Sequence, residues 1–144
     1  MLLKDLIANP AAYAEQRVTV NGWVRANRKQ KSFGFIALND GTALANVQLV
    51  YDDSLANFDA AGHLTVGSAL SAKGTVVLTE GGKQPFEIRV EELEILNQAP
   101  SDYPLQKKRH SFEYLRTQAH LRPRTNTFSA VFRLRSVIAF AVHQ

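Results

Sequence analysis

The sequence predicts a mainly β fold: a small Greek-key barrel of five strands with two short helices, followed by a helical segment. Two observations carry this prediction. Apolar and polar residues alternate with period two in several segments between Arg17 and Ile95, which is typical of strands that bury one face. A short helical pattern separates the third of these segments from the fourth.

The first elements are a helix and a strand. Apolar residues recur along one side of Leu2–Glu15, which predicts a short helix. Pro10 interrupts it, because proline lacks an amide hydrogen and clashes with the preceding turn. In Arg17–Arg25 the valines occupy alternate positions, so this segment is predicted to be a strand with the valines buried. A basic run at 25–31 follows, and we expect it to form a loop.

The next two strands are predicted at Ser32–Asn39 and Thr42–Tyr51. Asp40-Gly41 between them is a strong signal for a hairpin with a two-residue turn. In that register Phe35 would oppose Asn46, with Gln48 one diagonal step away on the same outer face.

The remaining elements complete a barrel. Asp52–Ala61 is predicted to hold a short helix, and Ala69–Thr79 and Phe86–Ile95 are predicted to be strands joined by a turn at Glu80–Pro85. The alternation slips by one residue at Glu91-Glu92, which indicates a β-bulge. Five strands with a helix between the third and the fourth is the arrangement of an OB-fold, a barrel that commonly binds oligonucleotides on its second and third strands.

The composition changes after the last strand. We expect an OB-fold domain at 1–99, a linker or hinge segment at 100–123 and the start of a second domain at 124–144, where an apolar stripe predicts an incomplete amphipathic helix. Residues 1–100 carry nine Lys and Arg against eleven Asp and Glu, whereas residues 101–144 carry eight against two. Four of the nine cations lie in the basic run, which favours a focused contact with nucleic acid over general polyanion binding.

Several kinds of chemistry are not expected. The chain has no cysteine and hence no disulfide. No apolar run reaches the ~20 residues that a membrane span needs, so no membrane partner is predicted. The four histidines show no metal-ligand spacing. No arrangement of nucleophile and base emerges either, so we predict no catalytic residue, metal site or cofactor in this chain.

The outer face of the second and third strands carries the candidate site. An exposed aromatic ring can stack on an unpaired base, an amide can bind the base edge, and nearby cations can hold phosphates. A structural aromatic and a solvated basic loop are the alternatives that the residues alone leave open. The candidate RNA contacts are Phe35, Gln48, Arg28, Arg25, Lys29, Lys31 and Asn46.

Three blocks of the chain resemble the N-terminal part of bacterial asparaginyl-tRNA synthetases, class II enzymes of the subgroup that includes the aspartyl and lysyl synthetases. The first two blocks identify the subgroup: Val20-Asn21-Gly22-Trp23-Val24-Arg25, and Phe33-Gly34-Phe35-Ile36 through Asn39-Asp40-Gly41 to Val47-Gln48-Leu49-Val50. The third favours asparagine over its relatives: Tyr103-Pro104, Lys107-Lys108-Arg109-His110-Ser111 and Ala119-His120-Leu121-Arg122-Pro123-Arg124-Thr125-Asn126.

The resemblance implies specific roles. The family's stacking aromatic falls on Phe35, its glutamine that binds the middle anticodon uridine falls on Gln48, and a basic residue of the first loop falls on Arg28. The segment from Arg124 onward resembles motif 1, a helix at the dimer interface. The implied parent is a cytoplasmic, homodimeric ligase that joins asparagine to tRNA(Asn) with ATP and Mg²⁺.

The resemblance places ATP-binding motifs 2 and 3 in a missing catalytic domain, so this chain alone is expected to be inactive. Two other hypotheses are a freestanding OB-fold RNA-binding protein and a fragment of an aspartyl or lysyl synthetase. The apolar stripe near the end of the chain disfavours the freestanding protein, because such a stripe needs a partner surface.

Overall fold

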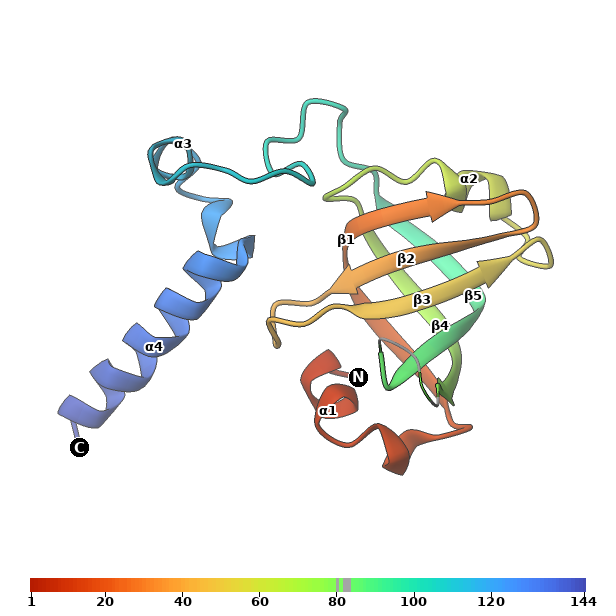
Figure 1. Ribbon diagram of the computed structural model, residues 1–144, viewed down its shortest axis with the longest axis horizontal. Helices are drawn as coiled ribbons and strands as arrows, with labels where there is room; N and C mark the ends of the chain where they lie inside the picture. The colour runs from red at the N-terminus through yellow and green to blue at the C-terminus, as the bar shows by residue number, and fades with distance from the viewer. Residues whose placement is uncertain (80, 82–83) are drawn as a thin grey trace. The chain divides into compact units, whose positions relative to one another are not determined.

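The computed structural model describes residues 1–79, 81 and 84–144 and contains two compact units, Met1–Tyr103 and Pro104–Gln144. The first unit is a closed barrel with the strand order β1-β2-β3-β5-β4 (Figure 1). This confirms the predicted OB-fold. The predicted turn at Glu80–Pro85 lies partly outside the described residues. The strands are β1 Arg17–Lys29, β2 Phe33–Asn39, β3 Val47–Asp52, β4 Ala69–Leu78 and β5 Phe86–Asn97.

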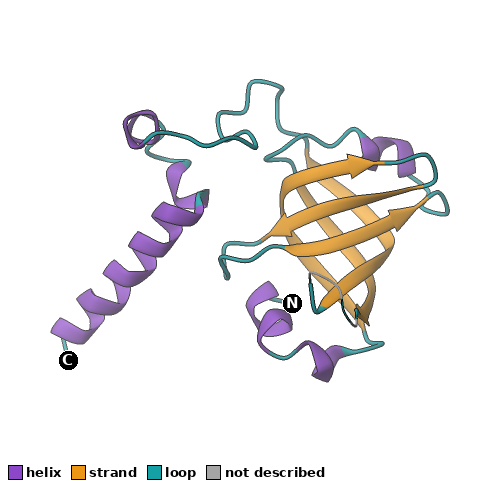
Figure 2. Cartoon of the chain, viewed as in Figure 1, coloured by secondary structure: helices purple, strands orange, loops and turns teal. Residues whose placement is uncertain are grey.

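The helices are short except for the last one (Figure 2). Pro10 ends the first helix as predicted, and a 3-10 turn, η1, restarts the chain there. The helix predicted between the third and fourth strands is present but begins later, at Phe58. The helical elements are α1 Leu3–Ala8, η1 Pro10–Tyr13, α2 Phe58–Gly62, α3 Phe112–Thr117, η2 Arg122–Arg124 and α4 Asn126–Val142.

Alternating apolar side chains fill the barrel. Val20, Val24, Ile36, Leu49 and Ile88 are fully buried. Burial of a side chain of this size contributes about 1.5–3 kcal/mol relative to exposure, so this core is the main source of stability of the first unit. The predicted slip in β5 is a bulge, because consecutive β4 residues pair with residues two apart in β5 on either side of Glu91.

The basic run differs from the prediction. Its first residues are not a loop, because β1 continues to Lys29 and pairs there with β2. An irregularity between Val24 and Ala26 leaves Arg25 as an extra residue in β1. The extra residue breaks the period-two pattern, so the alternation in the sequence ends before the strand does.

The hairpin register was predicted wrongly. Phe35 pairs with Val50, not with Asn46, and residues 40–46 form a long loop between β2 and β3. The buried Asn39 side chain organises this loop. It accepts a hydrogen bond from the Gly41 amide at 2.8 Å and donates to the Ala45 carbonyl at 3.1 Å. Local side-chain hydrogen bonds therefore outweigh the tendency of Asp-Gly to make a two-residue turn.

Asp40 ties this loop to the first helix. One carboxylate oxygen accepts from the Leu3 amide at 2.8 Å, and the other accepts from the Thr42 amide at 2.9 Å. Burial acts to raise the pKa of Asp40, but the hydrogen bonds from Thr42 and Leu3 outweigh it, so the pKa lies below its ordinary value.

A partly buried polar network supports β1, β3 and α2. Asn27 points toward the barrel end and donates to the carbonyls of Ala61 and Leu64, at 2.8 and 3.1 Å. The Asn27 side-chain oxygen, Oδ1, accepts a hydrogen bond from the Tyr51 hydroxyl at 3.1 Å. Gly34, opposite Tyr51, leaves room for that ring, because a Cβ there would lie 2.2 Å from Tyr51 Cζ.

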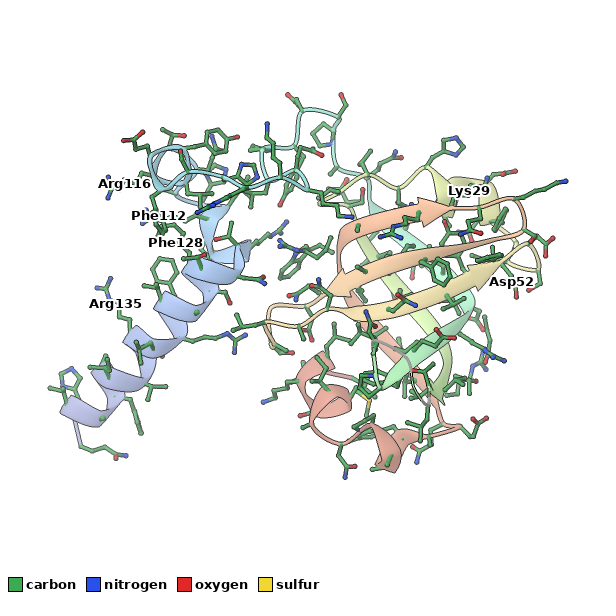
Figure 3. The ribbon with its side chains drawn as sticks, in the orientation of Figure 1. Lys29, Asp52, Phe112, Arg116, Phe128 and Arg135 are labelled. Carbon is green, nitrogen blue, oxygen red and sulfur yellow. The ribbon has the colours of Figure 1, made fainter. Side chains whose placement is uncertain are left out.

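The second unit has its own aromatic cluster. The Phe112 and Phe128 rings meet edge to face at 6.1 Å (Figure 3). The guanidinium of Arg122 lies 4.9 Å from the Phe128 ring centroid. Thr125 caps α4 by accepting from the Phe128 amide. The helix predicted in this segment is therefore present.

Candidate nucleic-acid interface

A row of outward side chains crosses neighbouring strands of the barrel. Arg28 on β1 pairs with Phe35 on β2, and Phe35 pairs with Val50 on β3. Directly paired residues project from the same face of a sheet. The three side chains therefore lie side by side on the outer face, with the aromatic ring between a cation and a small apolar group.

Phe35 is half-buried, so part of its ring remains open to solvent. Phe33, two residues earlier on the same face, contacts it with ring centroids 5.4 Å apart and planes at 87°. This edge-to-face geometry is a favoured aromatic contact. It restrains the Phe35 ring and prepares a platform for stacking.

Gln48 lies diagonally next to Phe35. It pairs directly with Ala37, while Phe35 pairs with Val50, two residues further along β3. The two side chains thus share the outer face as the sequence predicted, although the register differs. Gln48 Nε2 donates to Glu87 Oε2 at 3.5 Å. Ala37, the direct partner of Gln48, carries only a methyl group on this face.

Asn46 is not brought to this site. It lies in the loop between β2 and β3, where its side-chain oxygen accepts from Asn39 Nδ2 at 3.0 Å. The prediction placed it opposite Phe35, which required the two-residue turn that the loop does not form. Its structural role is to hold the loop.

Lys29 is also separated from the other cations. It follows Arg28 in β1 and so projects from the opposite face, where its ammonium pairs with Asp59 and lies 4.6 Å from the Phe58 ring centroid. Figure 3 shows it beside α2. The hydrogen bond from Lys29 holds the pKa of the Asp59 carboxyl below its ordinary value. Lys29 therefore attaches α2 to the barrel.

The other predicted cations remain near the outer face. Arg28 is exposed next to Phe35, and Lys31 is exposed in the turn between β1 and β2. Within the described part of the chain, neither side chain makes a hydrogen bond or ion pair. Arg25 is half-buried at the irregularity in β1. Arg28 and Lys31 have no competing carboxylate partner, so both are available to bind phosphates.

Arg17 and Lys73, elsewhere on the barrel, are already paired with acidic side chains. Arg17 binds Glu91 at 2.9 Å and Glu92 at 2.8 Å, and Lys73 binds Glu92 at 2.8 Å. Their hydrogen bonds, that of Lys73 foremost, hold the pKa of Glu92 below its ordinary value. Arg17 and Lys73 are consequently engaged with carboxylates, whereas Arg28 and Lys31 are not, within the described residues.

Two residues of β5 near this face were not predicted from the sequence. Glu87 contacts Gln48, and Arg89 pairs with Val50 through the parallel contact between β3 and β5. Alternation in Phe86–Val90 was sufficient to place both side chains outward. It gave no signal of which strand lies beside them, because that contact joins distant segments.

Metal-binding clusters and membrane-spanning helices were also sought in the described residues. The described residues contain no group of three or more His, Cys, Asp or Glu side chains that could hold a metal ion. None of the helices in the described ranges has the length and apolar character for crossing a membrane. What the face can do is stack a base, hydrogen-bond its edge and bind its phosphates.

Comparison with known proteins identifies the family of the barrel. The family model for the tRNA anticodon type of OB-fold nucleic acid binding domain matches residues 18–96, more than half of the chain. The chain belongs to this family. The match spans β1 to β5 and so includes every residue of the outer-face row.

Relatives of this OB-fold domain extend the similarity to the whole chain. It is 54% identical to an asparagine–tRNA ligase of Bacillus cereus (strain ATCC 10987 / NRS 248) over 99% of its length. It is 55% identical to the corresponding ligase of Acetivibrio thermocellus, also over 99%. These alignments cover 31% of each relative, so the chain spans about a third of their length.

Solved structures of asparaginyl-tRNA synthetases are also similar to this chain. The asparaginyl-tRNA synthetase of Pyrococcus horikoshii, complexed with asparaginyl-adenylate, matches 99% of this chain and 33% of its own, with a TM-score of 0.85 and 25% identity. The Entamoeba histolytica enzyme matches 92% of this chain with a TM-score of 0.74 and 24% identity. The second likeness concerns the fold alone.

Proposed function

We propose that this chain recognises the anticodon of tRNA(Asn) as part of an asparagine–tRNA ligase. The observation that carries the proposal is the diagonal pair of Phe35 and Gln48 on the outer face of a barrel of the anticodon-binding family. The ring stacks on the middle uridine of the anticodon, and the Gln48 amide hydrogen-bonds to the edge of that base.

Arg28 and Lys31 bind phosphates next to the stacked base. Both are exposed and lack carboxylate partners within the described residues. Arg25 supports the same charge from the β1 irregularity. Stacking is worth roughly 1–3 kcal/mol per base, and phosphate contacts add affinity that does not depend on the sequence.

The rest of the proposed enzyme lies in the two thirds of the relatives that the chain does not cover. We propose that the parent protein is a cytoplasmic homodimer that uses ATP and Mg²⁺ to join asparagine to tRNA(Asn). In that protein 1–99 is the anticodon-binding domain, 100–123 the hinge and 124–144 the start of the catalytic domain. The high identity to asparagine–tRNA ligases supports these assignments.

The direct test is fluorescence anisotropy with a labelled anticodon stem-loop carrying GUU, compared with a loop in which the middle U is C. We expect tighter binding to the U loop. Phe35→Ala should lower affinity by roughly five- to 150-fold, which corresponds to the loss of one stacked base. Gln48→Ala should reduce the preference for U over C.

Matched variants control for the substitutions themselves. Phe112→Ala changes an exposed phenylalanine of the second unit, and Gln98→Ala changes an exposed glutamine after β5. Both should bind like the unmodified chain. Equal affinity for the two loops would instead indicate a general single-strand RNA-binding barrel and contradict the proposed function.

A further inference from the structure

The row that contains Phe35 continues beyond β3. Val50 pairs with Arg89 on β5, so Arg28, Phe35, Val50 and Arg89 form one line across four neighbouring strands. These strands, β1, β2, β3 and β5, are labelled in Figure 1. Neighbouring strands lie about 4.8 Å apart, so the two arginines are separated by roughly 14 Å of sheet. One cation stands on each side of the aromatic platform.

Arg89 is exposed, and its side chain makes no hydrogen bond or ion pair within residues 1–79, 81 and 84–144. The nearest acids on its own strand, two residues away in each direction, are already engaged. Glu87 accepts from Gln48, and Glu91 binds Arg17 and accepts from Thr75 at 2.7 Å. Arg89 thus differs from Arg17 and Lys73, whose charges are paired on the same barrel.

We propose that Arg89 is a phosphate-binding residue of this face and that the bound RNA strand crosses the row from the Arg28 side to the Arg89 side. This inference rests on the proposed function, because the strand is held in place by the base stacked on Phe35. Arginine suits the task, since its planar guanidinium donates two parallel hydrogen bonds to phosphate oxygens.

The proposed path of the RNA strand also fits the small side chains that lie between the two arginines. Val50 and Ala37 are small, half-buried groups next to the ring and the amide. They leave the centre of the row open for a base. The charges lie only at its ends, where the sugar-phosphate backbone enters and leaves the face.

The test measures binding of the GUU and GCU stem-loops to the intact chain over a range of salt concentrations. Arg89→Gln should weaken both loops by the same factor and reduce the slope of log K against log salt by about one. Arg89→Lys should keep the slope, because the charge remains. Lys73→Gln, which removes a cation already paired with Glu92, should leave the slope unchanged.

Neutral methylphosphonate linkages, introduced one at a time in the loop, identify the phosphate. One linkage should weaken binding of the unmodified chain but not of Arg89→Gln, and a different linkage should behave in this way for Arg28→Gln. If Phe35→Ala weakens binding while Arg89→Gln retains the full salt slope, Arg89 binds no phosphate and the inference is overturned. If the unmodified chain binds both loops equally, the proposed function itself has failed.

Discussion

The hydroxyl of Tyr51 donates a hydrogen bond to the side-chain oxygen of Asn27 across the interior of the barrel, at 3.1 Å. Burial raises the pKa of Tyr51, while this hydrogen bond acts in the opposite direction. Asn27 in turn donates to the carbonyls of Ala61 and Leu64. The pair therefore joins β3, β1 and the helix that covers this end of the barrel, just below the outer-face row.

Tyr51→Phe should destabilise the barrel. The substitution removes the hydrogen bond to the half-buried Asn27 side chain, which costs about 0.5–1.5 kcal/mol. Urea denaturation followed by circular dichroism gives the change in the free energy of unfolding. Tyr114→Phe removes a hydroxyl from an exposed tyrosine and should change stability by less than about 0.5 kcal/mol. Similar losses for the two variants would contradict the role of the Tyr51–Asn27 pair.

Gly34→Ala should destabilise the barrel more than the addition of a single methyl group normally does. The added Cβ would lie 2.2 Å from Tyr51 Cζ and 2.3 Å from its hydroxyl oxygen, so ring or strand must move, at about 1–3 kcal/mol. Tyr51→Leu shortens the side chain that causes the clash. The double variant should therefore lose less stability than the sum of the single variants. Additive losses would mean that the ring does not occupy the space above Gly34.

Asp40 should make the free energy of unfolding depend on pH in the acid range. Its pKa is lowered in the folded state, so its contribution is complete above the unfolded value of about 3.9 and is lost as the pH falls through the folded value. Asp40→Asn should be less stable than the unmodified chain at pH 7, and the difference should shrink below about pH 4. Asp102→Asn, in an exposed segment, should show no such trend. A pH-independent difference for Asp40→Asn would refute this account.

Lys29 and Arg28 are adjacent in the sequence, but their substitutions should affect RNA binding differently. Arg28→Gln should weaken binding of every stem-loop and reduce the salt slope by about one. Lys29→Gln should leave both properties unchanged, because its ammonium binds Asp59 on the other face of β1. The anisotropy titrations that test the proposed function measure both variants. Parallel losses would show that Lys29 leaves Asp59 to bind RNA.

The parts of the fold that were predictable are those with a local cause. Period-two alternation located the strands, and Pro10 located the end of the first helix. The outward placement of Phe35 and Gln48 follows from the same alternation. This outward placement is correct although the predicted hairpin register is wrong. The true register differs by an even number of residues, so each side chain stays on its face.

The errors arose where distant or side-chain contacts decide the outcome. Asn39 and Asp40 bind backbone groups of their own loop and of α1, which lengthened the loop and removed Asn46 from the face. The β1 irregularity at Arg25 interrupts the alternation, so the sequence did not show that β1 continues to Lys29. In that strand Lys29 projects from the face opposite to Arg28. The position of Arg89 beside Val50 could not be predicted, because the parallel contact between β3 and β5 joins distant segments.

That parallel contact also bears on the order in which the domain folds. The pairs between β3 and β5 are Leu49 with Ile88 and Val50 with Arg89, and the neighbouring Gln48–Glu87 contact joins residues 39 apart. Contacts of this separation form late, because a long loop must close first. A chain emerging from the ribosome can pair β1, β2 and β3 while β5 is still being synthesised. Such an intermediate would expose its aromatic platform with only one flanking arginine, and the second side would arrive when the barrel closes.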